Sequence, residues 1–313
     1  MAPLGMDGLI LTLRSAAGLL GRKLRRAAVL LVVGMSACGN PAEQAVTVNP
    51  PVADPSAIPR APALALVLSS GGPRGFAHIG VLKVLEEAGV HPDLIVGTSS
   101  GALVGVLYAA NPSARDIEAQ ALALGGADVF DYDVFRRRVS GAALQAWVNG
   151  ALANRLLDRL DVPVVVVATR QRDEIPVAFT RGDAGAAVRA SSAVPGSFAP
   201  VDISGITYID GDIGAPLPIA IARALGARRI IAVDVAQNVS RAPPPPGAPK
   251  DWTLEAVARR SKIEREEGGA DLVIVPLLPY RTGFSLEYRQ MAIATGERAA
   301  RAVLPQLRAL AAH

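Results

Sequence analysis

The chain has 313 residues, of which 50% are hydrophobic and 19% are charged. Disordered proteins combine low hydrophobicity with high net charge, so this composition excludes a mainly disordered chain. The length allows one or two folded domains with a sizeable core. Aromatic residues make up only 4% of the chain, too few for the stacking platforms that bind single-stranded nucleic acid.

The net charge of +4 is local rather than spread over the chain. Four basic residues lie together near the N-terminus: Arg22, Lys23, Arg25 and Arg26. Without these four, the 32 lysines and arginines fall to 28, equal to the 28 aspartates and glutamates. The rest of the chain is therefore neutral, which argues against a DNA-binding face, and we expect no nucleic acid partner.

The N-terminus has the pattern of an export signal. A basic run at 21–26 precedes an apolar run at 27–34, which is far shorter than the ~20 residues that a membrane-spanning helix needs. Ser36 and Ala37 directly precede Cys38, the only cysteine, and this arrangement resembles the lipobox of bacterial lipoprotein signals. The resemblance implies that residues 1–38 form the signal and that Cys38 is lipidated.

Met35 departs from the leucine that usually stands three residues before the lipobox cysteine. The alternative interpretation is therefore a cleaved signal with an incidental or buried thiol at Cys38. A lipidated cysteine carries acyl chains that are sufficient for stable membrane attachment. We expect a lipid-anchored protein on the periplasmic side of the bacterial cell envelope, and Gly39 favours the outer over the inner membrane.

A change in composition separates this signal from the folded domain. Residues 39–63 are rich in proline and alanine, which excludes a helix and favours an extended tether before a domain at 64–313. The apolar run at 64–68 leads into glycines and predicts a buried strand. Helical spacing of apolar residues predicts a helix over 76–88, which Gly89 ends.

The same alternation continues along the domain. Residues 93–97 predict a second buried strand, and 100–110 predict a helix. Further buried strands are predicted at 163–168, 229–234 and 271–276. We expect 113–160 to be mostly helical with loops, and 285–311 to form a C-terminal helix interrupted near Pro305. Strands that alternate with helices indicate an α/β fold with a mainly parallel sheet.

A G-x-S-x-G sequence, Gly97–Gly101, lies between the second strand and its helix. This is the context that a nucleophile elbow requires: Ser99 occupies a strained turn, and Gly97 and Gly101 avoid clashes with the adjacent strand and helix. The helix N-terminus favours negative charge that develops at the serine. The alternative interpretation is a glycine-rich turn that Ser100 caps.

A second glycine loop, Ser70–Gly75, follows the first strand. Its backbone N–H groups can converge on an anion, which fits either a dinucleotide phosphate loop or an oxyanion hole. The dinucleotide fingerprint needs glycine where Ser70 stands and an acidic residue at the end of the second strand, where the chain has its serine turn. We favour the oxyanion hole because it explains both loops with one reaction; a nucleotide-binding oxidoreductase is the remote alternative.

A serine nucleophile needs a proton acceptor. The chain has three histidines, and none lies in a motif with a nearby acid. We expect His78 to brace the glycine loop and His91 to lie on a surface loop. Asp210 follows a short predicted strand at 206–209 and precedes a glycine, so its carboxylate can reach into a cleft. The alternative is a turn aspartate that binds its own backbone.

Together, the three motifs resemble those of the patatin-like phospholipase family. They occur in the family's order: a glycine-rich loop at Gly71–Gly75, G-x-S-x-G at Gly97–Gly101, and D-G-x at Asp210–Asp212. Segments around the motifs match as well: 76–82, 189–200 and 214–218. The resemblance covers roughly 64–300. It implies a three-layer α/β/α fold with a mainly parallel central sheet and a Ser-Asp dyad without histidine.

The resemblance also implies roles for individual residues. Ser99 would be the nucleophile and Asp210 the base. The oxyanion site would be formed or braced by Gly71, Gly72, Arg74 and Gly75. Two departures from the family pattern are Ser70 in place of a glycine and Asp212 in place of glycine or alanine. A second carboxylate near Asp210 either raises the pKa of Asp210 or points to solvent, and we favour the second.

The reaction implied is hydrolysis of carboxylic esters of phospholipids, lysophospholipids or related acyl lipids through an acyl-enzyme. We expect no metal and no other cofactor, because no Ca²⁺ loop or zinc-ligand spacing is present. The apolar stretch at 121–160 is either a wall or cover for the acyl chain, or ordinary core. The alternative function is a lipid-binding or envelope-organising lipoprotein that kept the fold. The sequence leaves the oligomeric state undetermined.

Overall fold

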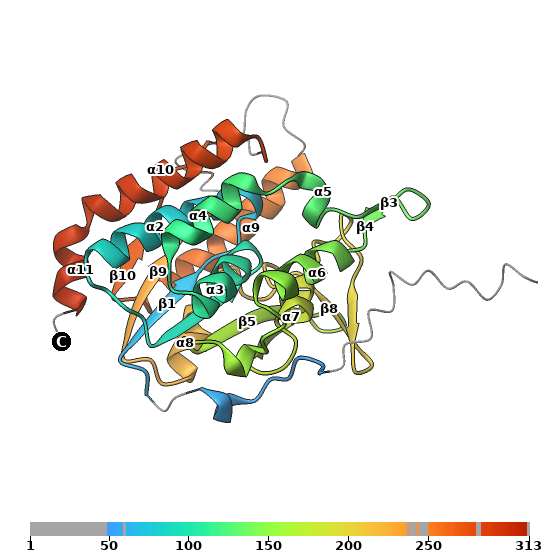
Figure 1. Cartoon of the computed structure of the whole chain (residues 1–313), viewed down its shortest axis with the longest axis horizontal. Coiled ribbons are helices and arrows are strands. Elements are labelled where there is room, and N and C mark those ends of the chain that lie inside the picture. Colours follow the sequence, from blue (N-terminus) through green and yellow to red (C-terminus); the bar gives the residue numbers. More distant parts are fainter. Residues whose placement is uncertain are drawn as a thin grey trace, which may run out of the picture. The chain divides into compact units, whose positions relative to one another are not determined.

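The computed structural model describes most of the domain (Figure 1). The described residues are 49–58, 61–236, 239, 243, 250–279 and 283–311. The predicted signal at 1–38, with Cys38, lies outside the described residues. Within the part of the chain that is described, no helix is both long and apolar enough to cross a membrane.

The regular elements alternate along the chain. The strands are β1 (Leu64–Leu68), β2 (Leu94–Thr98), β3 (Tyr132–Asp133), β4 (Arg138–Val139), β5 (Val164–Arg170), β6 (Ile175–Phe179), β7 (Val201–Ile203), β8 (Ile206–Ile209), β9 (Arg229–Val233) and β10 (Leu272–Ile274). The α-helices are α2 (Phe76–Glu87), α3 (Ser100–Ala110), α4 (Ala114–Ala123), α5 (Gly126–Val129), α6 (Ala142–Ala151), α7 (Ala184–Ser191), α8 (Ile219–Ala224), α9 (Lys250–Glu267), α10 (Leu286–Ala302) and α11 (Leu304–Ala311). Short 3-10 turns are η2 (Pro55–Ala57), η3 (Gly72–Gly75) and η4 (Leu157–Arg159).

One central sheet organises the domain, with strand order β10-β9-β1-β2-β5-β8-β7 and β6 paired to β5. The five strands from β10 to β5 are parallel, whereas β6 and β8 run antiparallel to β5. β1 lies inside the sheet, between β9 and β2, and is buried along its whole length. Such continuous apolar runs are typical of strands that are covered on both faces. The predicted α/β class and mainly parallel sheet are confirmed.

Alternate residues of β1 belong to two separate cores. Leu66 and Leu68 pack in the core that includes residues of α2, α3 and α10, while Ala65 and Val67 pack in the core that includes residues of α8 and α9. Figure 1 shows α2, α4 and α10 together over one face of the sheet. Because side chains alternate across a strand, each core lies on its own face, and the domain has the three layers expected.

Of two further predicted regions, one differs from the structure and one agrees with it. The stretch 113–160 contains three α-helices but also the β3–β4 hairpin, which the sequence pattern does not predict. The C-terminal helix is interrupted as expected, with α10 ending at Ala302 and α11 starting at Leu304, next to Pro305. Pro305 has no N–H to donate to the carbonyl four residues earlier, and proline is tolerated in the first turn of a helix, which explains why one helix ends and another begins here.

Part of the segment predicted as a tether packs on the domain. Val52 N donates to Arg181 O at 3.0 Å, and Thr180 N donates to Val52 O at 3.0 Å. Ile58 is buried in the same core as Val67 of β1. The packed chain therefore includes residues before the expected domain start at residue 64.

Candidate active site

Two strands meet end to end along one edge of β5. β2 pairs with β5 in parallel as far as Val167, and β8 pairs with β5 in the antiparallel sense down to Thr169. β6 occupies the other edge of β5 over this stretch, so β2 and β8 share one edge and run toward each other. Only Ala168 separates their last pairing positions. The residues that follow the two strands, Ser99 and Asp210, therefore meet at this point.

Ser99 lies in a strained turn between β2 and α3. Its backbone has φ +54° and ψ −118°, a region that residues other than glycine rarely occupy. The flanking glycines have no room for a side chain. A Cβ on Gly97 would lie 2.6 Å from Gly101 O, and one on Gly101 would lie 2.3 Å from Leu68 O. The turn is thus held between β1 and α3 with the Ser99 hydroxyl at the start of the helix.

The Ser99 hydroxyl donates a hydrogen bond of 2.9 Å to Oδ2 of Asp210. Asp210 is 2% exposed, and its Oδ1 accepts from the backbone N–H of Asp212 at 2.8 Å. Burial and the negative charge of Asp212 raise the pKa of Asp210 from 3.8 to about 7. A carboxylate with a pKa near neutrality is well matched to accept a proton at neutral pH. The geometry thus places a buried carboxylate in direct hydrogen bond with the serine hydroxyl.

Asp212 does not point to solvent, so that expectation is wrong. Its side chain is 14% exposed and is paired with Arg259 of α9, whose Nε lies 2.7 and 2.6 Å from the two carboxylate oxygens. The Ser70 hydroxyl also donates to Asp212. The guanidinium compensates the burial of the second carboxylate, and its charge lowers the pKa of Asp210 against the effect of Asp212.

Ser70 and Asp212 are thus the two departures from the family pattern, and they are in contact with each other. Their hydrogen bond joins the glycine loop to the turn that carries Asp210. The sequence gives no sign of the role of Arg259, because nothing in the spacing of α9 distinguishes it from its neighbours. It reaches the site only through tertiary packing.

The start of the glycine loop is fixed by buried polar contacts. Ser70 N donates to Pro216 O at 2.9 Å, and His78 Nε2 lies 3.0 Å from Ser69 O. Desolvation lowers the pKa of the buried His78 to about 4, so its neutral ring donates to this carbonyl. His78 therefore braces the loop, as the sequence predicted, and the predicted surface residue His91 is exposed.

The rest of the loop packs against the serine turn. A Cβ on Gly75 would lie 2.5 Å from the Cβ of Ser100, so the loop and α3 approach as closely as glycine allows. Gly72 has φ +55°, the left-handed region that favours glycine. Arg74 N donates to Gly71 O at 3.2 Å, as the loop turns into α2. Within the described part of the chain, the N–H groups of Gly71 and Gly72 donate to no protein acceptor.

A third segment holds both halves of the site. The Ser191 hydroxyl accepts from Ser99 N at 2.8 Å and donates to Val167 O at 2.5 Å. Gly211 N donates to Ser191 O at 3.1 Å, and Asp210 N donates to Ala193 O at 3.0 Å. These residues lie in the segment 189–200 that resembles the family, but no motif in the sequence predicts a role for Ser191.

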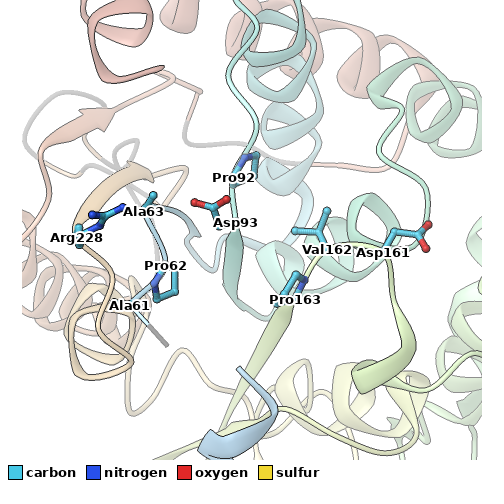
Figure 2. A pocket seen from close by; sticks show the side chains of 9 residues that line it. All are labelled: Ala61, Pro62, Ala63, Pro92, Asp93, Asp161, Val162, Pro163 and Arg228. Carbon is cyan, nitrogen blue, oxygen red and sulfur yellow. The ribbon is translucent and has the colours of Figure 1, made fainter. Parts of the chain in front are cut away.

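A surface hollow of about 480 Å³ lies elsewhere on the domain (Figure 2). Its lining residues are Ala61, Pro62, Ala63, Pro92, Asp93, Asp161, Val162, Pro163 and Arg228. These residues directly precede β1, β2, β5 and β9, whereas Ser99 follows the carboxyl end of β2. The hollow therefore lies at the amino ends of these strands, and the candidate site lies at the carboxyl end of β2.

Comparison with known proteins assigns the family. Residues 66–223, about half of the chain, match the family profile of patatin-like phospholipases. The chain is 36% identical over 205 residues to the uncharacterized NTE family protein Rv1063c of Mycobacterium tuberculosis, which covers 63% of this chain and 55% of that protein. It is 35% identical over 182 residues to human patatin-like phospholipase domain-containing protein 6. This match covers 55% of this chain and 13% of the human protein.

A solved structure shares the fold. The crystal structure of VipD from Legionella pneumophila has a TM-score of 0.52 to this chain at 14% sequence identity, over 78% of this chain and 67% of that one. This chain spans about half the length of the mycobacterial relative, so the match concerns the shared domain. By its sequence match, the chain belongs to the patatin-like phospholipase family.

Proposed function

We propose that this protein is a serine esterase that hydrolyses carboxylic esters of phospholipids or lysophospholipids, with Ser99 as nucleophile and Asp210 as base. One observation carries the proposal: the hydroxyl of a serine in a strained strand-to-helix turn donates at 2.9 Å to a buried carboxylate. The pKa of Asp210, raised to about 7, suits a group that exchanges a proton near neutral pH. Family membership supports the lipid substrate class.

In the proposed mechanism, Asp210 accepts the hydroxyl proton as Ser99 Oγ attacks the ester carbonyl. The N–H groups of Gly71 and Gly72 stabilise the tetrahedral oxyanion, and Arg74 braces the loop. Loss of one such donor typically lowers the rate by about 10²–10³. The alcohol leaves with the proton from Asp210, and water then cleaves the acyl-enzyme with the same carboxylate as base.

Aromatic side chains near the loop supply an apolar wall for the acyl chain in this proposal. The ring of Phe284 contacts Phe76 at 6.0 Å and Phe130 at 5.0 Å between centroids, and Phe130 contacts Phe198 at 6.1 Å. Phe76 directly follows the glycine loop, and Phe130 lies in the apolar stretch considered for this role. Acyl sites are lined mainly by such apolar groups.

The proposed location is the periplasmic side of the cell envelope, with the outer membrane favoured, through a lipid anchor on Cys38. Lipidation would hold the enzyme beside its substrate. Incorporation of labelled fatty acid in cells tests this step. We expect labelling of the natural chain and none of Cys38→Ser; equal labelling of both would overturn the anchor and leave the chemistry at Ser99 unaffected.

The activity is tested with the full chain in detergent micelles. A fluorophosphonate probe and a fatty-acyl ester are compared for the natural chain, Ser99→Ala and Asp210→Asn. We expect labelling and turnover in the natural chain, loss of both in Ser99→Ala, and strongly reduced turnover in Asp210→Asn. A folded natural chain that neither labels nor turns over esters, with or without micelles, would overturn the esterase and favour a lipid-binding lipoprotein.

A further inference from the structure

The β3–β4 hairpin exposes large apolar side chains. Phe135 is 99% exposed, Val134 is 74% exposed and Tyr132 is 58% exposed. The turn itself is well defined, because the Asp133 carboxylate accepts from Phe135 N at 2.9 Å and Arg136 N at 3.0 Å. Figure 1 shows the hairpin extending away from α5 and α6. An apolar cluster of this kind on a protruding turn marks an interaction site.

Basic residues accompany the apolar ones. Arg136, Arg137 and Arg138 follow Phe135 directly, and the first two are exposed. Asp133 supports the turn and pairs with Arg136, whose Nε lies 3.9 Å from the carboxylate, so Arg137 is the main exposed cation at the tip. Asp131 accepts from the first backbone N–H groups of α6. Apolar side chains next to arginines match a membrane surface, where acyl chains lie beneath anionic headgroups.

The hairpin is tied to the candidate active site. Val139 N donates to Ser197 O at 2.9 Å, and Ala199 N donates to Val139 O at 2.8 Å. Ser197 and Ala199 belong to the segment that follows Ser191. The hydroxyl of Ser191 accepts a hydrogen bond from the backbone N–H of Ser99. The same segment exposes Val194 to 41%. Val139 of the hairpin and Ser99 are therefore both hydrogen-bonded to the same segment, residues 191–199.

Further exposed apolar side chains lie close to Phe130, which precedes the hairpin. Phe130, two residues before Tyr132, packs against Phe284, which is 41% exposed, and Leu286 beside it is 44% exposed.

We propose that the hairpin tip, residues 132–138, docks on an anionic phospholipid surface, with Val134 and Phe135 entering the acyl region and the arginines at the lipid phosphates. The biological purpose of this docking rests on the proposed function, because it would present the site to its substrate. The docking itself requires no turnover. It is also separate from the anchor proposed at Cys38.

A local reporter tests the docking in the full chain. Phe135→Trp places an indole at the tip, and Val52→Trp is the control, since Val52 is 51% exposed but pairs with Arg181 rather than with the hairpin. Fluorescence is recorded with vesicles of phosphatidylglycerol and phosphatidylcholine, and with brominated phosphatidylcholine as quencher. The chain's two natural tryptophans give a background that the parent chain measures.

We expect a blue shift and strong quenching for Phe135→Trp only. The added Arg137→Gln should weaken vesicle affinity about fivefold, the ratio for ~1 kcal/mol per basic residue at an anionic surface. Equal responses of Phe135→Trp and Val52→Trp would overturn the proposal. So would a blue shift that appears on raising protein concentration without vesicles, because the face would then bind a second copy.

Activity separates this proposal from the esterase. Phe135→Ser should retain turnover of a short-chain soluble ester and lose turnover on anionic vesicles. If the natural chain turns over no ester but the reporter inserts, the esterase fails and the docking stands. If turnover on vesicles is unchanged in Phe135→Ser and the reporter stays in water, the docking fails and the esterase stands.

Discussion

Arg259 holds both carboxylate oxygens of Asp212, and Asp212 is the neighbouring charge that raises the pKa of Asp210. The two residues act on Asp210 in opposite directions. The charge of Asp212 disfavours ionisation of Asp210, and that of Arg259 favours it. The pH range in which Asp210 can accept a proton therefore depends on a residue of α9 that does not contact the serine.

Substituting Arg259 and substituting Asp212 should shift the midpoint of activity against pH in opposite directions. Arg259→Gln removes the favourable charge, so the pKa of Asp210 rises and the midpoint of activity against pH moves upward. Asp212→Asn removes the unfavourable charge and moves the midpoint downward. The measurement is kcat/KM for a soluble ester as a function of pH, with Arg265→Gln, an exposed residue of the same helix, as control. A common loss of activity at every pH, without movement of the midpoint, would contradict this role.

Asp210 should also make stability depend on pH. Its folded pKa of about 7 lies above the ordinary 3.8, so the folded state binds more protons than the unfolded state between these values. This stabilisation is complete below pH 3.8 and is lost as pH rises through about 7. We expect Asp210→Asn to be more stable than the natural chain above pH 7, with the difference shrinking as pH falls. Urea unfolding at several pH values measures it; a difference that stays constant would contradict the prediction.

Ser191→Ala should weaken both the fold and the turnover. It leaves the N–H of Ser99 and the carbonyl of Val167 without their hydroxyl partner, and each unsatisfied buried group costs about 1–3 kcal/mol. The serine turn then loses its support, so kcat should fall more than KM rises. The control is Ser192→Ala, at a partly exposed position. Equal effects of the two substitutions on unfolding and on kcat would show that the hydroxyl bridge is dispensable.

Two glycine substitutions should have opposite effects. A Cβ at Gly101 would lie 2.3 Å from a backbone oxygen of β1, so Gly101→Ala must displace the serine turn, and we expect loss of stability and of fluorophosphonate labelling. Gly150 in α6 has open space around it, and Gly150→Ala should gain up to ~1 kcal/mol from helix propensity. Thermal unfolding of both variants tests this. A Gly101→Ala protein that unfolds and labels like the natural chain would show that the turn tolerates a side chain.

Local patterns were sufficient to predict the elements around Ser99. The buried run of β1 and the helical spacing of α2 and α3 are properties of short segments, and the predicted bounds agree closely with the structure. β6 escaped prediction because it is partly exposed at the edge of β5 and contains Pro176, so it lacks a buried apolar run. The hairpin escaped because each of its strands has two residues.

The environment of the site depended on contacts that no motif contains. The residue types at the two turns, together with the resemblance to the patatin-like family, predict Ser99 as the candidate nucleophile and Asp210 as the candidate base. The orientation of Asp212 depended on Arg259, which lies 47 positions away in the sequence. Neither the glycine loop nor the D-G-x motif carries that information, so the expected solvent-facing carboxylate was the natural but wrong inference.

The end-to-end meeting of β2 and β8 makes the fold modular. The distance between Ser99 and Asp210 is set by the pairing of β2 and β8 with β5 and by the contacts of the segment at Ser191, which are only a small part of the more than one hundred residues between them. Evolution or protein engineering can therefore lengthen, shorten or exchange the outer parts of that connection to suit a new substrate. Ser99 and Asp210 stay in register as long as β5 and its two neighbours keep their pairing.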